Sequence, residues 1–170
     1  RRTMPKTKDL YIDIGAASKA AAEDKVSLGD YGVFDSAVVE FGDGLIKAKA
    51  IDDRVGCAAL LKLIEDEPPI DTWFCFTVQE EVGLRGAASM AYALDPGFAM
   101  VLEGTTAADL AEVEGGKAVC RIRGGVVLPF MDGATIYDAE LFELLRNACD
   151  KRGIRWQTKT RVAGGTDAGR

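Results

Sequence analysis

Two adjacent carboxylates, Glu80 and Glu81, stand where a strongly apolar stretch of the sequence ends. The preceding residues 72–78 are rich in aromatic and β-branched side chains and too few for a typical helix, which predicts a strand buried on both faces. Ligands of open α/β sheets bind beyond the carboxyl ends of the strands. An isolated Glu-Glu pair is more often the solvated start of a loop, so a site is favoured only because the pattern recurs.

The same pattern occurs twice more in the chain. Residues 45–51 alternate apolar and polar side chains and then meet Asp52 and Asp53, and the wholly apolar residues 98–102 meet Glu103. If these strands are neighbours in one sheet, we expect their acids to converge with Glu80 and Glu81 at one edge. Ionised carboxylates raise each other's pKa, so such a cluster needs a cation. Oxygen ligands indicate divalent metals, and adjacent carboxylates can bridge two of them.

Composition excludes several classes of partner. The 170 residues carry 27 acids and 21 bases, a net charge of −6, and no dense basic run, so we expect no nucleic-acid partner. No apolar run approaches the length of a membrane span, so we expect no membrane partner. With 48% hydrophobic and 28% charged residues, the chain is typical of a globular protein with a substantial core.

Cysteine and histidine usage narrows the chemistry further. None of the cysteines has Cys-x-x-Cys spacing, and scattered thiols favour a reducing, cytoplasmic location over a disulfide framework. The chain has no histidine, so neither a Ser-His-Asp triad nor a histidine-rich metal site can be built from these residues alone. The chain begins at Arg1 without a methionine and stops in the glycine-rich turn 164–170, which predicts an internal fragment.

The element pattern predicts two domains. Residues 1–44 are expected to contain short strands at 10–14, 33–34 and 37–41, a helical turn from Ser18 to Glu23 and a hairpin at 42–44. This pattern indicates part of a small β-barrel. Residues 45–170 alternate strands and helices, which predicts an α/β sandwich with a mostly parallel sheet. Strands are expected at 45–51, 72–78, 98–102, 118–123 and 155–160, with an edge or irregular segment at 126–130 and a loop over 104–117.

Three helices are predicted in the second domain. One follows Asp52 and Asp53, with one of these acids as its N-cap, one covers 87–93, and one runs from the N-cap Asp138 to Gly153. Helical spacing predicts two buried stripes, Cys57, Leu60, Leu61 and Ile64 on the first helix and Leu141, Leu144, Leu145 and Ala148 on the last.

Several other residues are candidates for the site or for the core. Residues 164–169 lack the Lys and Ser/Thr of a phosphate loop and are interpreted as a turn near the site. Asp132 is expected to be a turn residue, and Asp109 is a candidate acid near the pocket. Arg85 could contact substrate or pair with an acid. Both tryptophans, Trp73 and Trp156, are expected in the core.

Residues 49–56, 78–86 and 164–169, in this order and spacing, resemble the dinuclear-metal aminopeptidases that assemble into tetrahedral particles. This is the glutamyl/leucyl aminopeptidase group, also labelled endoglucanase-M-like or FrvX-like. The resemblance covers nearly the whole chain, and residues 11–16 resemble the family's insertion domain. It implies a three-layer αβα sandwich of the zinc-peptidase type, with part of a β-barrel insertion and dimerisation domain. It also implies a dodecameric homo-oligomer acting on peptides.

The resemblance assigns a role to each acid. Asp52 corresponds to the carboxylate that bridges two metal ions and is joined to Asp53 by a cis peptide bond. Glu81 corresponds to a terminal ligand of one ion, and Glu103 stands where the family has an Asp or Glu ligand of the other. Glu80 corresponds to the general base. The family's two histidine ligands would lie outside residues 1–170, and zinc, cobalt or manganese would suit the mixed ligand set.

Two other functions remain open at this point. A glycosidase with two carboxylates is the first, although such enzymes hold their acids on opposite sides of a sugar and use no metal. A catalytically inert fragment that serves in assembly is the second. The aminopeptidase is the leading hypothesis, with the fragment alone expected to be inactive.

Overall fold

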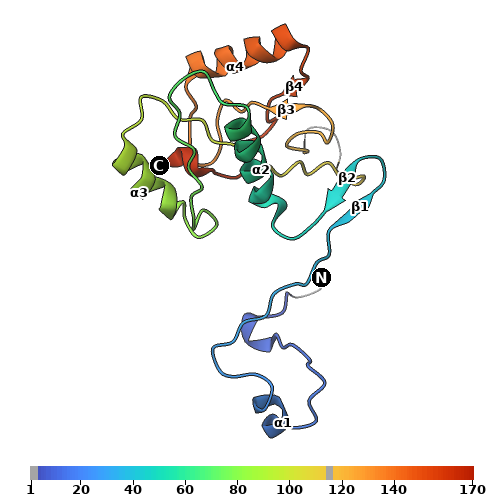
Figure 1. The fold of residues 1–170 in the computed structure, drawn as a ribbon. Helices are drawn as coiled ribbons and strands as arrows, with labels where there is room; N and C mark the ends of the chain where they lie inside the picture. The colour runs from blue at the N-terminus through green and yellow to red at the C-terminus, as the bar shows by residue number, and fades with distance from the viewer. Residues whose placement is uncertain (1–3, 114–116) are drawn as a thin grey trace. The chain divides into compact units, whose positions relative to one another are not determined.

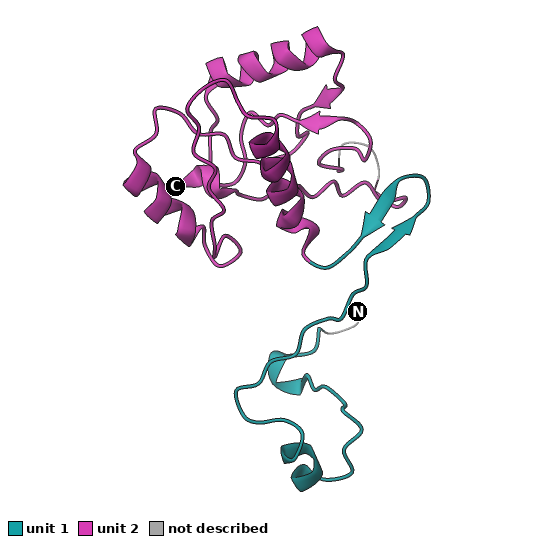
Figure 2. Ribbon diagram, viewed as in Figure 1, with its two compact units in different colours: residues 1–49 teal, residues 50–170 magenta. Residues whose placement is uncertain are grey.

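The computed structural model describes residues 4–113 and 117–170, and the chain forms two compact units, residues 1–49 and residues 50–170 (Figure 2). The predicted domain that begins at residue 1 and the loop predicted over 104–117 each include a few residues outside the described ranges. The predicted domain boundary between residues 44 and 45 stays a prediction.

The first unit contains short local elements. They are the 3-10 turn η1 (Thr7–Asp9), the helix α1 (Lys19–Glu23) and the strands β1 (Val39–Phe41) and β2 (Leu45–Lys47). Ser18 caps α1 as predicted, because its hydroxyl accepts a hydrogen bond from the Ala21 N–H at 3.2 Å. The hairpin predicted at 42–44 is also present, with β1 and β2 antiparallel around it. The strand predicted at 45–51 therefore ends at Lys47 and pairs within this hairpin, not in a parallel sheet.

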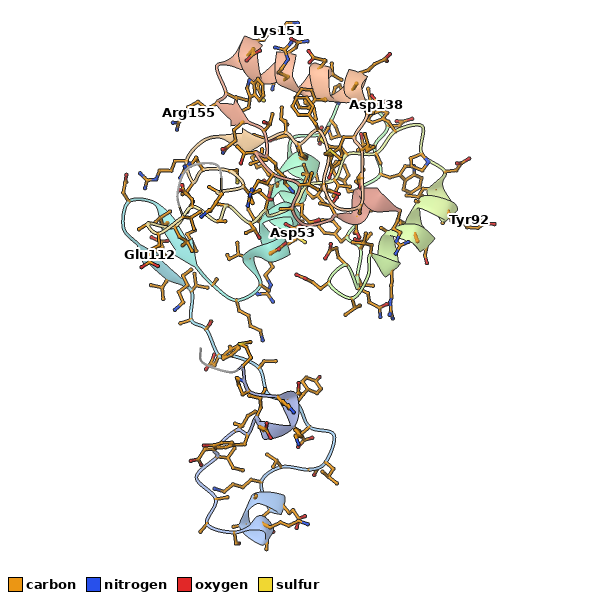
Figure 3. All side chains as sticks on the ribbon, turned by 180° about the vertical axis from the view of Figure 1, so that it is seen from behind. Asp53, Tyr92, Glu112, Asp138, Lys151 and Arg155 are labelled. Atoms are coloured by element: carbon orange, nitrogen blue, oxygen red, sulfur yellow. The ribbon has the colours of Figure 1, made fainter. Side chains whose placement is uncertain are left out.

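The second unit contains three α-helices and a short C-terminal turn. They are α2 (Ile51–Glu65), α3 (Arg85–Leu94), α4 (Ala139–Arg152) and the 3-10 turn η2 (Asp167–Gly169) (Figure 1). The last helix is capped as predicted, since the Asp138 carboxylate accepts from the Leu141 N–H at 2.8 Å and Gly153 ends the helix at φ +64°. Asp138 and Lys151 mark its two ends in Figure 3.

The start of α2 departs from regular helix geometry at its two acids. Asp52 and Asp53 have non-helical backbone angles, and the peptide bond between them is cis, as the resemblance implies. The Asp53 carboxylate accepts from the Gly56 N–H at 3.0 Å, so Asp53 is the functional N-cap, as one of these two acids was expected to be. The helix ends at Glu65, with Asp66 as its C-cap, before the predicted stop at Pro68.

The sheets are smaller than predicted. Within the described residues, strands β3 (Val126–Val127) and β4 (Trp156–Gln157) form a parallel pair, and β1 and β2 form the hairpin. The strands predicted at 72–78, 98–102 and 118–123 are not assigned. Apolar, β-branched composition shows that a segment suits a buried ladder, but a strand also requires a hydrogen-bonded partner. The architecture of the described chain is thus α/β with two two-stranded sheets.

The core of the second unit lies under α4. Leu128, Phe142 and Cys149 are buried together, and Leu145 and Trp156 pack against them. The Phe142 ring lies 4.2 Å from that of Phe130 and 6.3 Å, edge-on, from that of Trp156. Aromatic contacts of this kind add to the free energy gained by burial.

Some predictions about burial were wrong. On α4 the buried side chains are Phe142 and Cys149, while Leu144 is exposed, so the stripe is displaced by about one residue. On α2, Cys57, Leu61 and Ile64 are exposed and Leu60 is half-buried. Trp73 is 76% exposed, although Trp156 is in the core as expected. Among residues 4–113 and 117–170, no helix is long and apolar enough to cross a membrane.

Candidate active site

The four acids singled out by the sequence line one pocket in the second unit. Asp52, Glu80, Glu81 and Glu103 surround a volume of about 380 Å³, within the range of small-ligand pockets. The acids come from the start of α2, a loop and a segment without strand pairing, not from the edge of a formed sheet. The other lining residues are Leu84, Gly104, Thr105, Thr106, Lys159, Ala163, Gly164, Gly165 and Thr166.

Asp53 connects two parts of this pocket. One of its carboxylate oxygens accepts from the Gly56 N–H in α2 and from the Gly104 N–H, both at 3.0 Å. Figure 3 shows Asp53 at the start of the helix. A Cβ on Gly56 would clash with the Leu102 carbonyl oxygen as well as with this carboxylate, so only glycine fits here. The link holds Glu103, the residue before Gly104, close to Asp52.

Three acids are close enough to share a cation. Asp52, Asp53 and Glu103 each offer an oxygen, and these oxygens lie within 4.8 Å of one another. Glu81 is not part of this tight group, although it lines the same pocket. Because Asp53 already accepts two backbone hydrogen bonds, its carboxylate positions the other acids.

Glu80 and Glu81 lie on a loop whose ends are bonded together. The Gly86 N–H donates to the Val78 carbonyl at 3.0 Å, and the Arg85 N–H donates to the Gln79 carbonyl at 3.2 Å. The Glu80 carbonyl accepts from Leu84 at 2.9 Å. A Cβ on Gly86 would lie 2.7 Å from the Val78 nitrogen, so the close approach of the two ends requires glycine.

Two of the acids, Glu80 and Glu103, have raised pKa values. Burial, followed by the charges of Asp53, Glu80 and Asp52 and a hydrogen bond with Asp52, raises the pKa of Glu103 to about 8. The pKa of Glu80 is raised by burial and then by the charges of Glu81, Asp167, Asp52 and Asp53. Carboxylates in this state gain from a bound cation, because its charge offsets their mutual repulsion.

The turn predicted near the site at 164–169 does border the pocket. Gly164, Gly165 and Thr166 line it, and η2 packs against α3 (Figure 1). The Thr77 hydroxyl donates to Asp167, which joins the turn to the segment before Glu80. The Arg170 guanidinium donates to the Gly83 carbonyl at 3.3 Å.

Asp132 closes a neighbouring turn, as predicted. It is 4% exposed, and one of its oxygens accepts from the Ala134 and Thr135 N–H groups at 2.7 and 2.8 Å. The Tyr137 hydroxyl donates to its other oxygen and lies 3.3 Å from the hydroxyl of Thr166. Burial and the bond to Asp132 raise the pKa of Tyr137 to about 12. Burial opposes the charged form of Asp132, but these hydrogen bonds and the positive charge of Lys159 outweigh it and lower the pKa of Asp132.

Two other sequence candidates do not line the pocket, and one charged lining residue was missed. Asp109 forms an ion pair with Arg121 and accepts from the Ile122 N–H, and it does not line the pocket. Arg85 does not line it either. The missed residue is Lys159, whose only signal was its place in the predicted strand leading into the 164–169 turn.

An α/β unit whose pocket gathers carboxylates is typical of metal-dependent hydrolases. The chain belongs to the M42 glutamyl aminopeptidase family, which it matches over residues 1–170. It is 37% identical over 162 residues to a putative aminopeptidase of Acetivibrio thermocellus, covering 94% of this chain and 48% of that protein.

Solved structures agree with this assignment. An aminopeptidase from the archaeon Desulfurococcus kamchatkensis has a TM-score of 0.89 and 35% identity, over 99% of this chain and 49% of that one. The TET1 peptidase of Pyrococcus horikoshii has a TM-score of 0.68 and 31% identity, over 92% of this chain and 47% of that one. That peptidase can assemble into a tetrahedron or a large octahedral shell. The chain thus spans about half the length of the relatives it matches.

Proposed function

We propose that the protein carrying this chain is a metal-dependent aminopeptidase that removes N-terminal residues from peptides. The observation that carries the proposal is the meeting of Asp52, Glu80, Glu81 and Glu103 in one pocket. Membership of the M42 family supports the reaction class. Because the chain covers about half of its relatives, the proposal concerns the whole protein and not residues 1–170 by themselves.

The proposed fold of the whole protein is a three-layer αβα sandwich. Segments 72–78 and 98–102 would be inner strands that pair with residues outside this chain. Residues 45–170 would belong to this catalytic domain and residues 1–44 to a β-barrel insertion domain used in dimerisation. The TM-score of 0.89 to the Desulfurococcus kamchatkensis aminopeptidase, a chain about twice as long, supports this arrangement.

The donor set fits divalent metal ions. All the donors are carboxylate oxygens, and those of Asp52 and Glu103 lie within 4.8 Å of each other and of an Asp53 oxygen. Burial and charge repulsion raise the pKa of Glu103, and a cation would offset the repulsion. Asp52, Glu81 and Glu103 would hold two ions, together with imidazoles from outside residues 1–170. Zinc, cobalt and manganese all suit oxygen and nitrogen ligands.

Glu80 would be the general base. When bound, the metal ions would polarise the scissile carbonyl and lower the pKa of the attacking water. A Glu80 carboxylate oxygen takes a proton from that water as the water oxygen bonds to the carbonyl carbon. Glu80 then gives this proton to the amine nitrogen as the C–N bond breaks. The free α-amino group of the peptide would bind a metal or the neighbouring carboxylates, which limits cleavage to the first residue.

The proposal also covers the assembly and the location of the protein. A homo-oligomer, a dodecamer by resemblance, is proposed because a similar solved peptidase assembles into closed shells. A cytoplasmic location is proposed from the scattered cysteines.

Replacement of Glu80 by Gln tests the mechanism. In the full-length protein, Glu80→Gln should keep the metal content while hydrolysis of aminoacyl p-nitroanilides falls by about 10²- to 10⁴-fold. Glu65→Gln is the matched control, because Glu65 is an exposed acid on α2 that pairs with Lys62. Near-normal turnover of the Glu80 variant would show that another group is the base.

The matched family gives no support to the glycosidase hypothesis. Chelation separates the two reactions, since a carboxylate-pair glycosidase needs no metal. Activity on aminoacyl arylamides that is lost in chelator and absent on cellulose is the result expected here.

A further inference from the structure

The pocket also contains a positive charge. Lys159 is the one cationic side chain among the described residues that line it, opposite in sign to the four acids. The residue is half-buried, and its ammonium group donates a hydrogen bond to the Ala163 carbonyl at 2.9 Å. This bond fixes Lys159 against the segment that leads into Gly164, Gly165 and Thr166.

Lys159 forms no ion pair with the four acids of the pocket, although its charge also acts on the buried Asp132 and lowers the pKa of that carboxyl group. Within residues 4–113 and 117–170, no carboxylate oxygen lies within ion-pair distance of its nitrogen, whereas Lys62 on the surface pairs with Glu65 and Asp66. An ammonium group has three N–H donors, and the Ala163 carbonyl uses one. Removing an ammonium from bulk water is costly unless an anion or further acceptors replace the water. A carboxylate of a ligand would supply both the charge and the acceptors.

We propose that Lys159 binds a carboxylate of the substrate and thereby sets substrate preference. This inference rests on the proposed aminopeptidase function and deepens it. A ligand filling a pocket of about 380 Å³ meets charges of both signs, so its α-ammonium group pairs with the acids and its carboxylate with Lys159. The carboxylate has two sources, the side chain of an N-terminal Asp or Glu, or the C-terminal group of a dipeptide.

Lys159→Met tests this in the metal-loaded full-length protein, because methionine keeps much of the side-chain length and removes the charge. The first assay compares kcat/KM for glutamyl and leucyl p-nitroanilides, which have no C-terminal carboxylate. The second compares the dipeptide Leu-Gly with Leu-Gly amide. If the acidic side chain is the ligand, the variant lowers the Glu/Leu ratio by about 10- to 100-fold, as expected for a charge-assisted contact.

The two sources give different results. A C-terminal ligand predicts that the Leu-Gly acid/amide ratio falls while the Glu/Leu ratio does not. In either case hydrolysis of leucyl p-nitroanilide stays within about threefold of wild type, because that substrate has no carboxylate for Lys159 to bind. Lys159→Arg should restore much of the lost preference. Lys62→Met, which removes an exposed lysine of α2 outside the pocket, should change neither ratio.

A binding assay separates this proposal from the proposed reaction. Calorimetry with L-glutamate and L-leucine measures the preference without catalysis, and Lys159→Met should remove any advantage of glutamate. If no peptide is hydrolysed but the glutamate preference depends on Lys159, the reaction is wrong and the carboxylate site stands. If both kinetic ratios and the binding preference are unchanged in Lys159→Met, or if all substrates lose activity equally, Lys159 only supports the Ala163 segment and the proposal is overturned.

Discussion

Neighbouring acids in this site have different tasks because their surroundings differ. One carboxylate oxygen of Asp53 accepts hydrogen bonds from the backbone N–H groups of Gly56 and Gly104, and so joins α2 to the residue after Glu103. Asp52 lines the pocket. A sequence with two consecutive aspartates does not show which of them caps and which faces a ligand. The sequence predicts that one of the two aspartates caps the helix. Which of them does so depends on the backbone geometry at the start of α2.

The acids of the pocket were predictable because each follows a segment with the composition or alternation of a strand. Lys159 was not, since a lysine in an alternating segment resembles any solvated strand residue. Its contact with the Ala163 carbonyl depends on how the turn after residue 160 folds back, which no local pattern encodes.

The buried Asp132 predicts a pH-dependent contribution to stability. Hydrogen bonds hold its folded-state pKa below the ordinary value of about 3.9, so its stabilising effect is present above that value and lost as pH falls through the lower one. Asp132→Asn should therefore lower the free energy of unfolding by about 1–3 kcal/mol at pH 7. The difference in unfolding free energy between wild type and Asp132→Asn should be fully present above about pH 5. It should disappear as the pH falls below the ordinary aspartate pKa of about 3.9. Urea unfolding across pH measures it.

Asp66→Asn provides the control for this prediction. Asp66 is an exposed acid that pairs with Lys62, and surface pairs contribute less than about 1 kcal/mol. An equal loss of stability at pH 3 and pH 7 for Asp132→Asn would show that the charge of Asp132 does not matter.

Helices were predicted more accurately than strands, for a physical reason. The signals at Ser18, Asp138 and Gly153 act within one turn of the chain, and each places a helix end where it is observed. A strand depends on a distant partner, so residues 72–78 and 98–102 have strand composition without a paired strand in the described chain. The displaced stripe on α4 has a similar cause, because its buried face is chosen by Leu128 and Trp156.

The closed loop 78–86 gives a test of how an element positions the site. Gly86→Ala would force a Cβ against the backbone of Val78 and open the loop that carries Glu80 and Glu81. We expect metal affinity to fall by about 10-fold or more, the size seen when supports of metal ligands are removed. Titration of the metal-free full-length protein with zinc measures this.

Gly97→Ala is the matched control, because a Cβ there meets no atom within 4 Å. It should leave zinc affinity unchanged. If Gly86→Ala binds zinc as tightly as Gly97→Ala, the closed ends of the loop do not position the ligands.

At the scale of the whole molecule, the exposed apolar side chains need an explanation. Trp73 and Val78 are 76% and 68% exposed, and Phe98 and Met100 are 59% and 55% exposed. Apolar side chains exposed in such number usually mark a surface that contacts another part of a protein. The relatives are about twice as long as this chain, so the contact we propose is the rest of the same protein.

Hydrogen exchange of the full-length protein tests the proposed sandwich. If 72–78 and 98–102 are inner strands, their amides are bonded on both sides and should exchange as slowly as those of α4, which serves as the internal reference. Peptides covering these segments would then open only with the global unfolding reaction, because central strands exchange through it. Exchange as fast as in the urea-unfolded protein would mean that no partner strand pairs with them. The sandwich would then be wrong, even though the acids that follow these segments still line one pocket.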